Sequence, residues 1–210
     1  MSDLSVNSRI KDTAQYPAIT AYHLEQFLKS QQIKENTQYP INTLRHNSDK
    51  SIVISMQSYG GKHPERIQVE SFIKHVFYHH HNASLNVFMP ELIAATDNDD
   101  QVNAAVGIRK INDEPIFLEQ YLDQPIDSVI SQLANKHVSR NNIAEVGNLA
   151  CTSAGASRKI ISLLVHYFDS QNIDWAVCTG TSAVRAILNK LGVKFTFLQK
   201  ANPECLGDDQ

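Results

Sequence analysis

The chain has 210 residues, of which 42% are hydrophobic and 20% are charged, and its formal net charge is −3. This length supports one substantial hydrophobic core, and the composition is that of an ordinary globular domain. The slightly acidic balance excludes a general electrostatic attraction to nucleic acid or to an anionic membrane.

The cysteines and the apolar segments indicate the cellular compartment in which we expect the protein. The three cysteines are widely spaced and odd in number, which argues against a disulfide scaffold and favours a reducing cytoplasm. The first residues lack a basic region followed by an apolar run, so we expect no signal peptide. No apolar stretch of the sequence is long enough to span a bilayer, so we expect no transmembrane segment.

The first half of the chain begins with a polar segment whose apolar residues follow no clear periodicity. We expect a separate, partly flexible arm over residues 1–50, with a helix over 20–31, and a strand over 51–57. After Pro64, apolar residues recur every three or four positions and predict an amphipathic helix. Two short apolar segments, "FMPELIAATD" and "QVNAAVGIRK", follow on either side of an acidic turn and predict an antiparallel hairpin.

The second half alternates helices and strands. A helical stripe over 126–133 precedes a strand over 143–150 and a helix from about residue 157 to residue 168. "WAVCTGT" predicts a buried strand, "SAVRAILNKLG" a helix that ends at Gly192, and "VKFTFL" a last strand. This order predicts a mixed sheet with helices packed on it, in one α/β domain over residues 51–210.

A turn of small residues lies between the strand at 143–150 and the next helix. It runs from Thr152 to Ser157 and is followed by Arg158. Unpaired N–H groups at a helix start favour an anion, and small side chains let a diphosphate approach the backbone. The alternative is an ordinary turn with a Ser or Thr cap. The turn is neither a P-loop nor a GxGxxG fingerprint.

The strand, the turn and the elements up to "NKLGVKF" resemble the second half of GNAT-type N-acyltransferases. In that fold the turn binds the diphosphate of an acyl carrier, and the preceding strand, here residues 145–151, pairs with the pantetheine arm. The turn is a degenerate version of the usual GNAT pattern. The resemblance implies a GNAT-like, mixed and mostly antiparallel sheet flanked by helices, and a donor site formed by Leu149, Ala150, Cys151, Gly155, Ala156, Ser157 and Arg158.

Two narrower resemblances concern about two-thirds of the chain. The chain resembles the thermostable hemolysin family in the segments "VESFI", "NVFMPEL", "AAVGIRK", "IFLEQYLD", "IAEVGNLA", "LGVKF" and "ANPECL". The layout is also distantly similar to acyl-homoserine-lactone synthases. Where that family has Glu, Ser, Arg and Phe, this chain has Glu145, Gly147, Asn148 and Leu149. The missing Ser-Arg pair argues against homoserine lactone synthesis itself.

Acylation of an amine needs a base and donors for the developing oxyanion. Glu145 and Glu119 are the candidate bases, because partial burial raises a carboxyl pKa. Each is alternatively a structural carboxylate that caps a turn or pairs with Arg109 or Arg140. Asn148 either orients the substrate or a water, or is the amide of a strand bulge. The N–H of Leu149 or Ala150 is the candidate oxyanion donor.

Three further side chains have competing interpretations. Tyr121 either reprotonates the leaving thiolate or is a core tyrosine. Cys151 is either a covalent nucleophile or, as we favour, a small core residue. The consecutive histidines at 79–81 point in different directions on a helix and have no carboxylate at i+4, so we expect an exposed helix end and no metal site.

These features predict an enzyme, a cytoplasmic N-acyltransferase with no tightly bound cofactor. Its co-substrate is acyl-phosphopantetheine on acyl carrier protein or acyl-coenzyme A, and it transfers a long-chain acyl group to an amine such as an amino acid or amino-alcohol. One alternative is a hemolysin that acts directly on lipid bilayers, which would release liposome contents without any donor. The other is a non-catalytic module that binds the acyl carrier.

Overall fold

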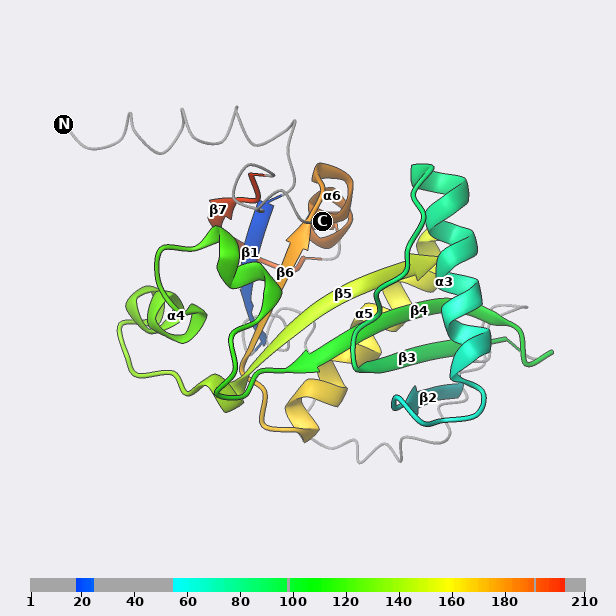
Figure 1. The fold of residues 1–210 in the computed structure, drawn as a ribbon, viewed down its shortest axis with the longest axis horizontal. Coiled ribbons are helices and arrows are strands. Elements are labelled where there is room, and N and C mark those ends of the chain that lie inside the picture. The colour runs from blue at the N-terminus through cyan, green and yellow to red at the C-terminus, as the bar shows by residue number, and fades with distance from the viewer. Residues whose placement is uncertain (1–17, 25–54, 98, 191, 203–210) are drawn as a thin grey trace. The chain divides into compact units, whose positions relative to one another are not determined.

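The computed structural model describes residues 18–24, 55–97, 99–190 and 192–202 (Figure 1). Seven strands form one sheet in these residues: β1 (Ala18–His23), β2 (Ser55–Tyr59), β3 (Glu91–Thr96), β4 (Val102–Lys110), β5 (Ile143–Cys151), β6 (Trp175–Gly180) and β7 (Phe195–Lys200). The helices are α3 (Arg66–His81), α4 (Ile126–Ala134), α5 (Ala154–Ser170) and α6 (Ser182–Lys190), with two short 3₁₀ helices, η2 (Phe117–Tyr121) and η3 (Arg140–Asn142).

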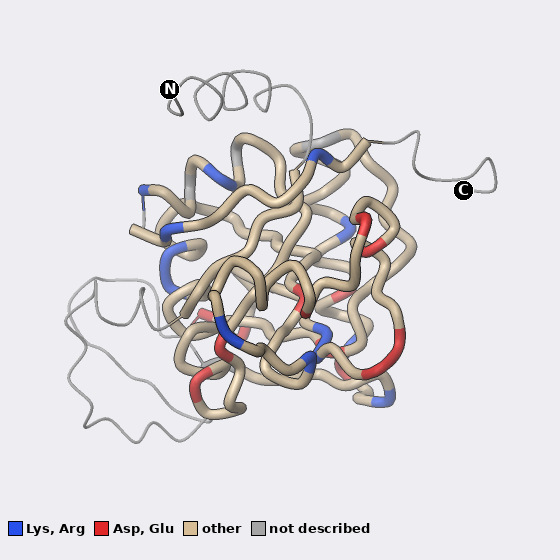
Figure 2. The backbone as a smooth tube through the Cα atoms, turned by 90° about the vertical axis from the view of Figure 1, so that its left-hand side faces the viewer, with Lys and Arg blue, Asp and Glu red and all other residues tan. Residues whose placement is uncertain are grey.

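The hydrogen-bonded strand order is β2-β3-β4-β5-β6-β1-β7. The pairs β2–β3, β3–β4, β1–β6 and β1–β7 are antiparallel, whereas β5 and β6 are parallel. This confirms the predicted fold class, a mixed and mostly antiparallel sheet flanked by helices. Figure 2 shows basic and acidic positions interspersed along the chain.

The chain divides into two compact units. The first contains β1, η2, α4, η3, β6, α6, β7 and the start of β5 up to Glu145. The second contains β2, α3, β3, β4, the remainder of β5 from Val146, and α5.

In the second unit, helices lie on both faces of the strands. Leu92 and Ala94 of β3 pack with Val69 and Ile73 of α3 in one core cluster. Successive strand residues point to opposite faces, and Figure 1 shows α5 on the other side of the strands from α3. The hairpin of β3 and β4 and the amphipathic helix after Pro64 are confirmed as predicted.

Helix α5 begins earlier than its apolar periodicity indicated. The Ser153 side chain accepts a hydrogen bond from the Ala156 N–H at 3.1 Å, and the helix starts at Ala154 instead of near residue 157. A serine cap satisfies one of the N–H groups left unpaired in the first turn. The apolar stripe of the helix, which is buried as predicted, consists of Ile160, Ile161, Leu164, Val165 and Phe168.

In the first unit, β1 lies between β6 and β7 and is bonded to both. The helix predicted over 20–31 is therefore wrong over residues 20–23, which form this strand, whereas Leu24 is helical. Ala18–His23 contains β-branched and aromatic residues and is buried at every position but the last, and ladders on both edges satisfy its backbone groups, which favours a strand over a helix. The division of the chain at residue 50 stays a prediction, but β1 belongs to the sheet.

The core of the first unit lies beneath α4 and η2. Ile126 and Ile130 of α4 and Leu118 of η2 pack with Ile19 of β1 and Val177 of β6. Tyr121 is 9% exposed and belongs to the same cluster, which supports its interpretation as a core tyrosine. Helix α4 confirms the predicted helical stripe over 126–133.

Candidate functional site

Strand β5 loses its parallel partner partway along its length. In the described register it pairs with β6 at Ile143, Ala144 and Glu145, although β5 continues to Cys151 and β6 to Gly180. An edge without a strand partner can form a ladder with an extended ligand. The residues predicted to contact the acyl donor, Leu149 to Cys151, lie in this last part of β5.

Glu145 occupies the final position of the ladder to β6 and is 5% exposed. Burial raises the pKa of the nearby Cys178 thiol, and the negative charge of Glu145 raises it further. The thiol of Cys178 lies 3.5 Å from the hydroxyl oxygens of both Thr20 and Tyr22, all within the first unit. Glu145 is thus a buried carboxylate beside a group of buried polar side chains, which its sequence neighbours do not indicate.

Asn148 has a left-handed backbone, with φ of 50°, inside β5. Its side-chain oxygen accepts a hydrogen bond from the Met89 N–H at 2.8 Å, and its amide nitrogen donates to the Val87 carbonyl at 3.4 Å. These contacts are those of a bulge amide that fixes β5 to the segment before β3. They support the structural interpretation of Asn148, within the second unit.

Two substitutions at Asn148 separate its backbone role from its side-chain role. Asn148→Ala loses both hydrogen bonds and leaves a β-carbon in the left-handed region, so we expect a loss of about 2–3 kcal/mol in the free energy of unfolding. Asn148→Gly loses the same bonds but tolerates the backbone, so about 1 kcal/mol should be lost. Urea unfolding measures both values. Equal, wild-type stability of the two variants would contradict a structural role.

The small-residue turn and the first turn of α5 lie together in the second unit. The Thr152 N–H and hydroxyl both donate to the Asn103 carbonyl, at 3.0 and 3.2 Å, which fixes the end of β5. Gly155 and Arg158 are exposed, whereas Ala156 and Ser157 are buried. Of the residues predicted to bind phosphate, Gly155 and Arg158 are therefore accessible to solvent.

Cys151 is half-buried at the end of β5. Burial raises its pKa, and a hydrogen bond with Ser157 lowers it by a smaller amount. A thiol is a weak nucleophile until it loses its proton. The raised pKa favours the interpretation of Cys151 as a packed residue over that of a covalent nucleophile.

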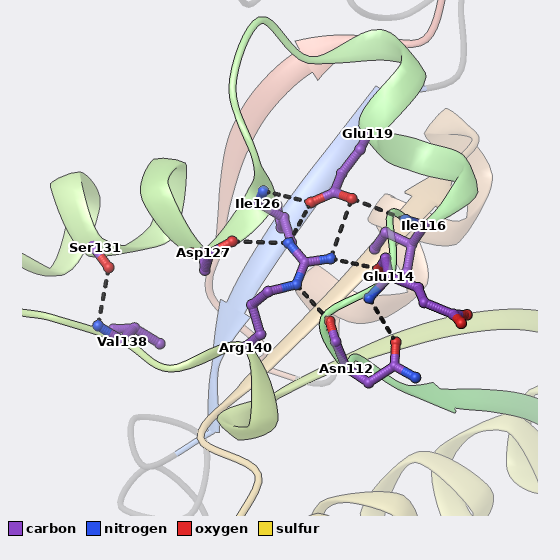
Figure 3. Close-up of polar contacts among 9 residues, drawn as sticks. All are labelled: Asn112, Glu114, Ile116, Glu119, Ile126, Asp127, Ser131, Val138 and Arg140. Carbon is purple, nitrogen blue, oxygen red and sulfur yellow. Dashed lines mark hydrogen bonds and ion pairs between the residues drawn. The ribbon is translucent and has the colours of Figure 1, made fainter.

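Glu119 lies in η2, in a network centred on Arg140 (Figure 3). One carboxylate oxygen accepts hydrogen bonds from the Ile126 N–H at 2.8 Å and from Arg140 at 2.7 Å. The other accepts from the Ile116 N–H at 2.8 Å and from Arg140 at 3.2 Å. Arg140 also donates to Asp127 at 2.8 Å.

This network lowers the pKa of Glu119. Burial acts in the opposite direction, but the hydrogen bonds from Arg140 and from the N–H groups of Ile126 and Ile116 outweigh it. A general base near neutral pH needs a raised carboxyl pKa, so this carboxylate is poorly suited to that role. The contacts support the structural alternative, a carboxylate paired with Arg140.

Arg66 is a buried arginine whose partners cannot be predicted from the sequence. Arg66 is 9% exposed, and its guanidinium donates to the carbonyl oxygens of Tyr59, Met89 and Pro90 at distances of 3.0, 2.8 and 2.8 Å. It also pairs with Glu70 one helical turn away. Backbone carbonyls are present at every residue, so such partners cannot be recognised from residue types.

Comparison with known proteins identifies the family. The family model described as "Thermostable hemolysin" matches residues 59–210, and the chain belongs to this family. This confirms the resemblance seen in the sequence. Comparison with the curated proteins found no match.

Two solved structures share a distant likeness with the chain. The crystal structure of TofI in a ternary complex with an inhibitor and MTA is 10% identical, and the match covers 64% of this chain and 77% of that one with a TM-score of 0.44. A functionally unknown conserved protein from Staphylococcus epidermidis ATCC 12228 is also 10% identical, and the match covers 95% of this chain and 65% of that one with a TM-score of 0.44.

None of the helices in the described ranges is long and apolar enough to cross a bilayer.

Proposed function

We propose that the protein is a GNAT-type N-acyltransferase that transfers a long-chain acyl group from acyl carrier protein or acyl-coenzyme A to an amine such as an amino acid or amino-alcohol. The observation that carries this proposal is the ladder between β5 and β6, which ends at Glu145 while β5 continues to Cys151. A mixed sheet with a short parallel ladder is compatible with a donor bound along one strand edge.

The donor would bind by backbone contacts. Amide groups of its pantetheine arm pair with the strand from Val146 to Cys151 as an added strand would. The N–H of Leu149 or Ala150 donates to the thioester oxygen as negative charge develops on it. Gly155 and Arg158, both exposed at the start of α5, bind the phosphate at the positive end of the helix dipole.

Glu145 would act as the base. The amine nitrogen attacks the thioester carbonyl carbon and Glu145 accepts the amine proton. The carbon–sulfur bond then breaks, and the leaving thiolate takes up this proton from Glu145, which releases the pantetheine thiol and restores the carboxylate. Asn148 supports this reaction by fixing β5 in place. Glu119 has a structural role and not a catalytic one, because its carboxylate accepts hydrogen bonds from Arg140 and from two backbone N–H groups.

Thermal unfolding with candidate donors tests this function. Coenzyme A, acyl-coenzyme A of increasing chain length, and holo and acyl forms of acyl carrier protein are added to the purified protein. A ligand that binds the native state raises the melting temperature by mass action, and we expect a rise that grows with acyl length. The absence of any shift, together with leakage from liposomes that contain no donor, would instead support a membrane-active hemolysin.

The Glu145→Gln variant separates binding from catalysis. We expect it to keep the donor-induced shift and to lose acyl transfer by about 100-fold or more, the usual effect of removing a general base. Glu114→Gln, at an exposed carboxylate, is the matched control and should transfer at the wild-type rate. Donor binding without turnover in the wild-type protein and unchanged binding in Glu145→Gln would indicate a carrier-binding module.

A further inference from the structure

Two histidines of α3 lie one helical turn apart on the same face. His75 and His79 are at positions i and i+4, and their ring centroids are 4.2 Å apart with an angle of 54° between the ring planes. Both side chains are exposed. The i, i+4 spacing indicates this pair in the sequence, separately from the consecutive histidines at 79–81.

We propose that His75 and His79 bind a divalent transition-metal ion of the class of Zn²⁺, Ni²⁺ or Cu²⁺. Imidazole nitrogen is a preferred ligand for these ions. With metal–nitrogen bonds of about 2.1 Å and nitrogen–metal–nitrogen angles of about 90–110°, two imidazoles on one ion have ring centroids roughly 4.6–5.3 Å apart. The observed separation of 4.2 Å is smaller, so the exposed rings rotate apart to accommodate the ion.

The surroundings of the pair suit a cation. His79 lies in the last turn of α3, where the helix dipole is negative, and His75 lies one turn earlier. The amine of Lys74, the neighbouring basic residue, lies over the Phe88 ring, 5.5 Å from its centroid, in a cation–π contact.

With two protein ligands, the proposed metal site has coordination positions that the protein does not fill. The described residues contain no group of three or more His, Cys, Asp or Glu side chains that would hold a metal. Two imidazoles therefore leave the remaining coordination positions to water or to another ligand. A closed structural zinc site has four protein ligands, so we infer a weakly held, exchangeable ion that cross-links one turn of α3.

Isothermal titration of the full-length, tag-free protein with Zn²⁺ tests this proposal. We expect one Zn²⁺ per chain and no binding of Mg²⁺, which prefers oxygen ligands. His75→Ala and His79→Ala should each weaken Zn²⁺ binding by about tenfold or more, because one of two ligands is lost. Far-UV circular dichroism checks that the helix content is unchanged in each variant.

His80→Ala is the matched control, since His80 is an exposed histidine at the same end of α3 but on a different face from the pair. It should bind Zn²⁺ within about twofold of the wild-type protein. An equal loss in all three variants would overturn the proposal and indicate nonspecific binding by a histidine-rich segment. Wild-type affinity in His75→Ala or His79→Ala would overturn it as well.

Discussion

Replacing Arg140 with alanine should lower the free energy of unfolding by about 3–5 kcal/mol, the usual effect of removing one partner from a buried ion pair. The side chains of Arg140 and Glu119 are 15% and 11% exposed, so little water is available to replace the lost contacts. The substitution also removes the hydrogen bonds from Arg140 to the carbonyl oxygens of Asn112 and Glu114, at 2.6 and 2.9 Å.

Chemical unfolding in urea measures this loss. Arg140→Lys keeps the charge but not the planar fork of donors, so it should lie between alanine and wild type. Lys136→Ala, at an exposed residue before η3, is the control and should change the free energy of unfolding by less than about 0.5 kcal/mol. If Arg140→Ala were as stable as this control, the network would contribute nothing to the fold.

The pH dependence of stability provides a second readout of the same variant. The pKa of Glu119 is lower in the folded protein than its ordinary value of 4.5. The unfolded chain therefore takes up the proton first, and the stability due to Glu119 is complete above about pH 4.5 and is lost as the pH falls through the folded pKa. Arg140→Ala should reduce this loss on the acid side, because the main partner of the charged carboxylate is gone.

Replacing Gly107 with alanine should lower the free energy of unfolding by about 1–3 kcal/mol through overpacking. A β-carbon at Gly107 would lie 2.7 Å from the Met89 Cβ and 2.7 Å from the side-chain oxygen of Asn148. The Met89 Cβ is attached directly to the backbone and cannot rotate away. The new methyl group should therefore also disturb the hydrogen bond between Asn148 and the Met89 N–H.

Gly147→Ala is a close comparison in the neighbouring strand. Its β-carbon would meet the terminal methyl of Met89 at 2.7 Å, and this end of the side chain can move to another rotamer. We expect a loss of less than about 1 kcal/mol. Gly61→Ala, where nothing lies within 4 Å of the added carbon, is the control. Thermal and urea unfolding rank the three variants, and equal effects at Gly107 and Gly61 would contradict the packing argument.

Local sequence patterns predicted the elements that can be recognised from apolar spacing or turn residues within one short segment. The apolar stripes of α3, α4 and α5 recur at helical spacing, and the acidic turn marks the hairpin of β3 and β4. The start of α5 was missed because periodicity detects buried residues, whereas Ser153 and the exposed first turn are defined by a cap.

Strand β1 was missed for a different reason. It is a six-residue strand whose first five residues are all buried, and the periodicity of such a short run does not distinguish a strand from a helix. The ladders that decide in favour of a strand come from β6 and β7, which are distant in sequence. Thr20, for example, is paired with Cys178.

The sequence predicts where the candidate site lies in the chain, but it does not predict the role of each side chain. The strand and the small-residue turn occur where the sequence placed them. The roles of Glu119 and Asn148 depend on partners in other segments, namely Arg140 and the backbone around Met89. A carboxylate or an amide in a sequence does not reveal whether such a partner will bind it.

The position of β1 between β6 and β7 has a consequence for how the chain folds during synthesis. Thr20 and Cys178 are separated by 158 positions, so β1 emerges from the ribosome long before its neighbours exist. At about 5–20 residues per second, this interval is roughly 10–30 seconds. The strands β2, β3 and β4 can pair within that time, whereas the sheet of the first unit must wait for the last part of the chain. An isolated, apolar β1 is thus available to chaperones, or to another copy of the nascent chain, until synthesis is nearly complete.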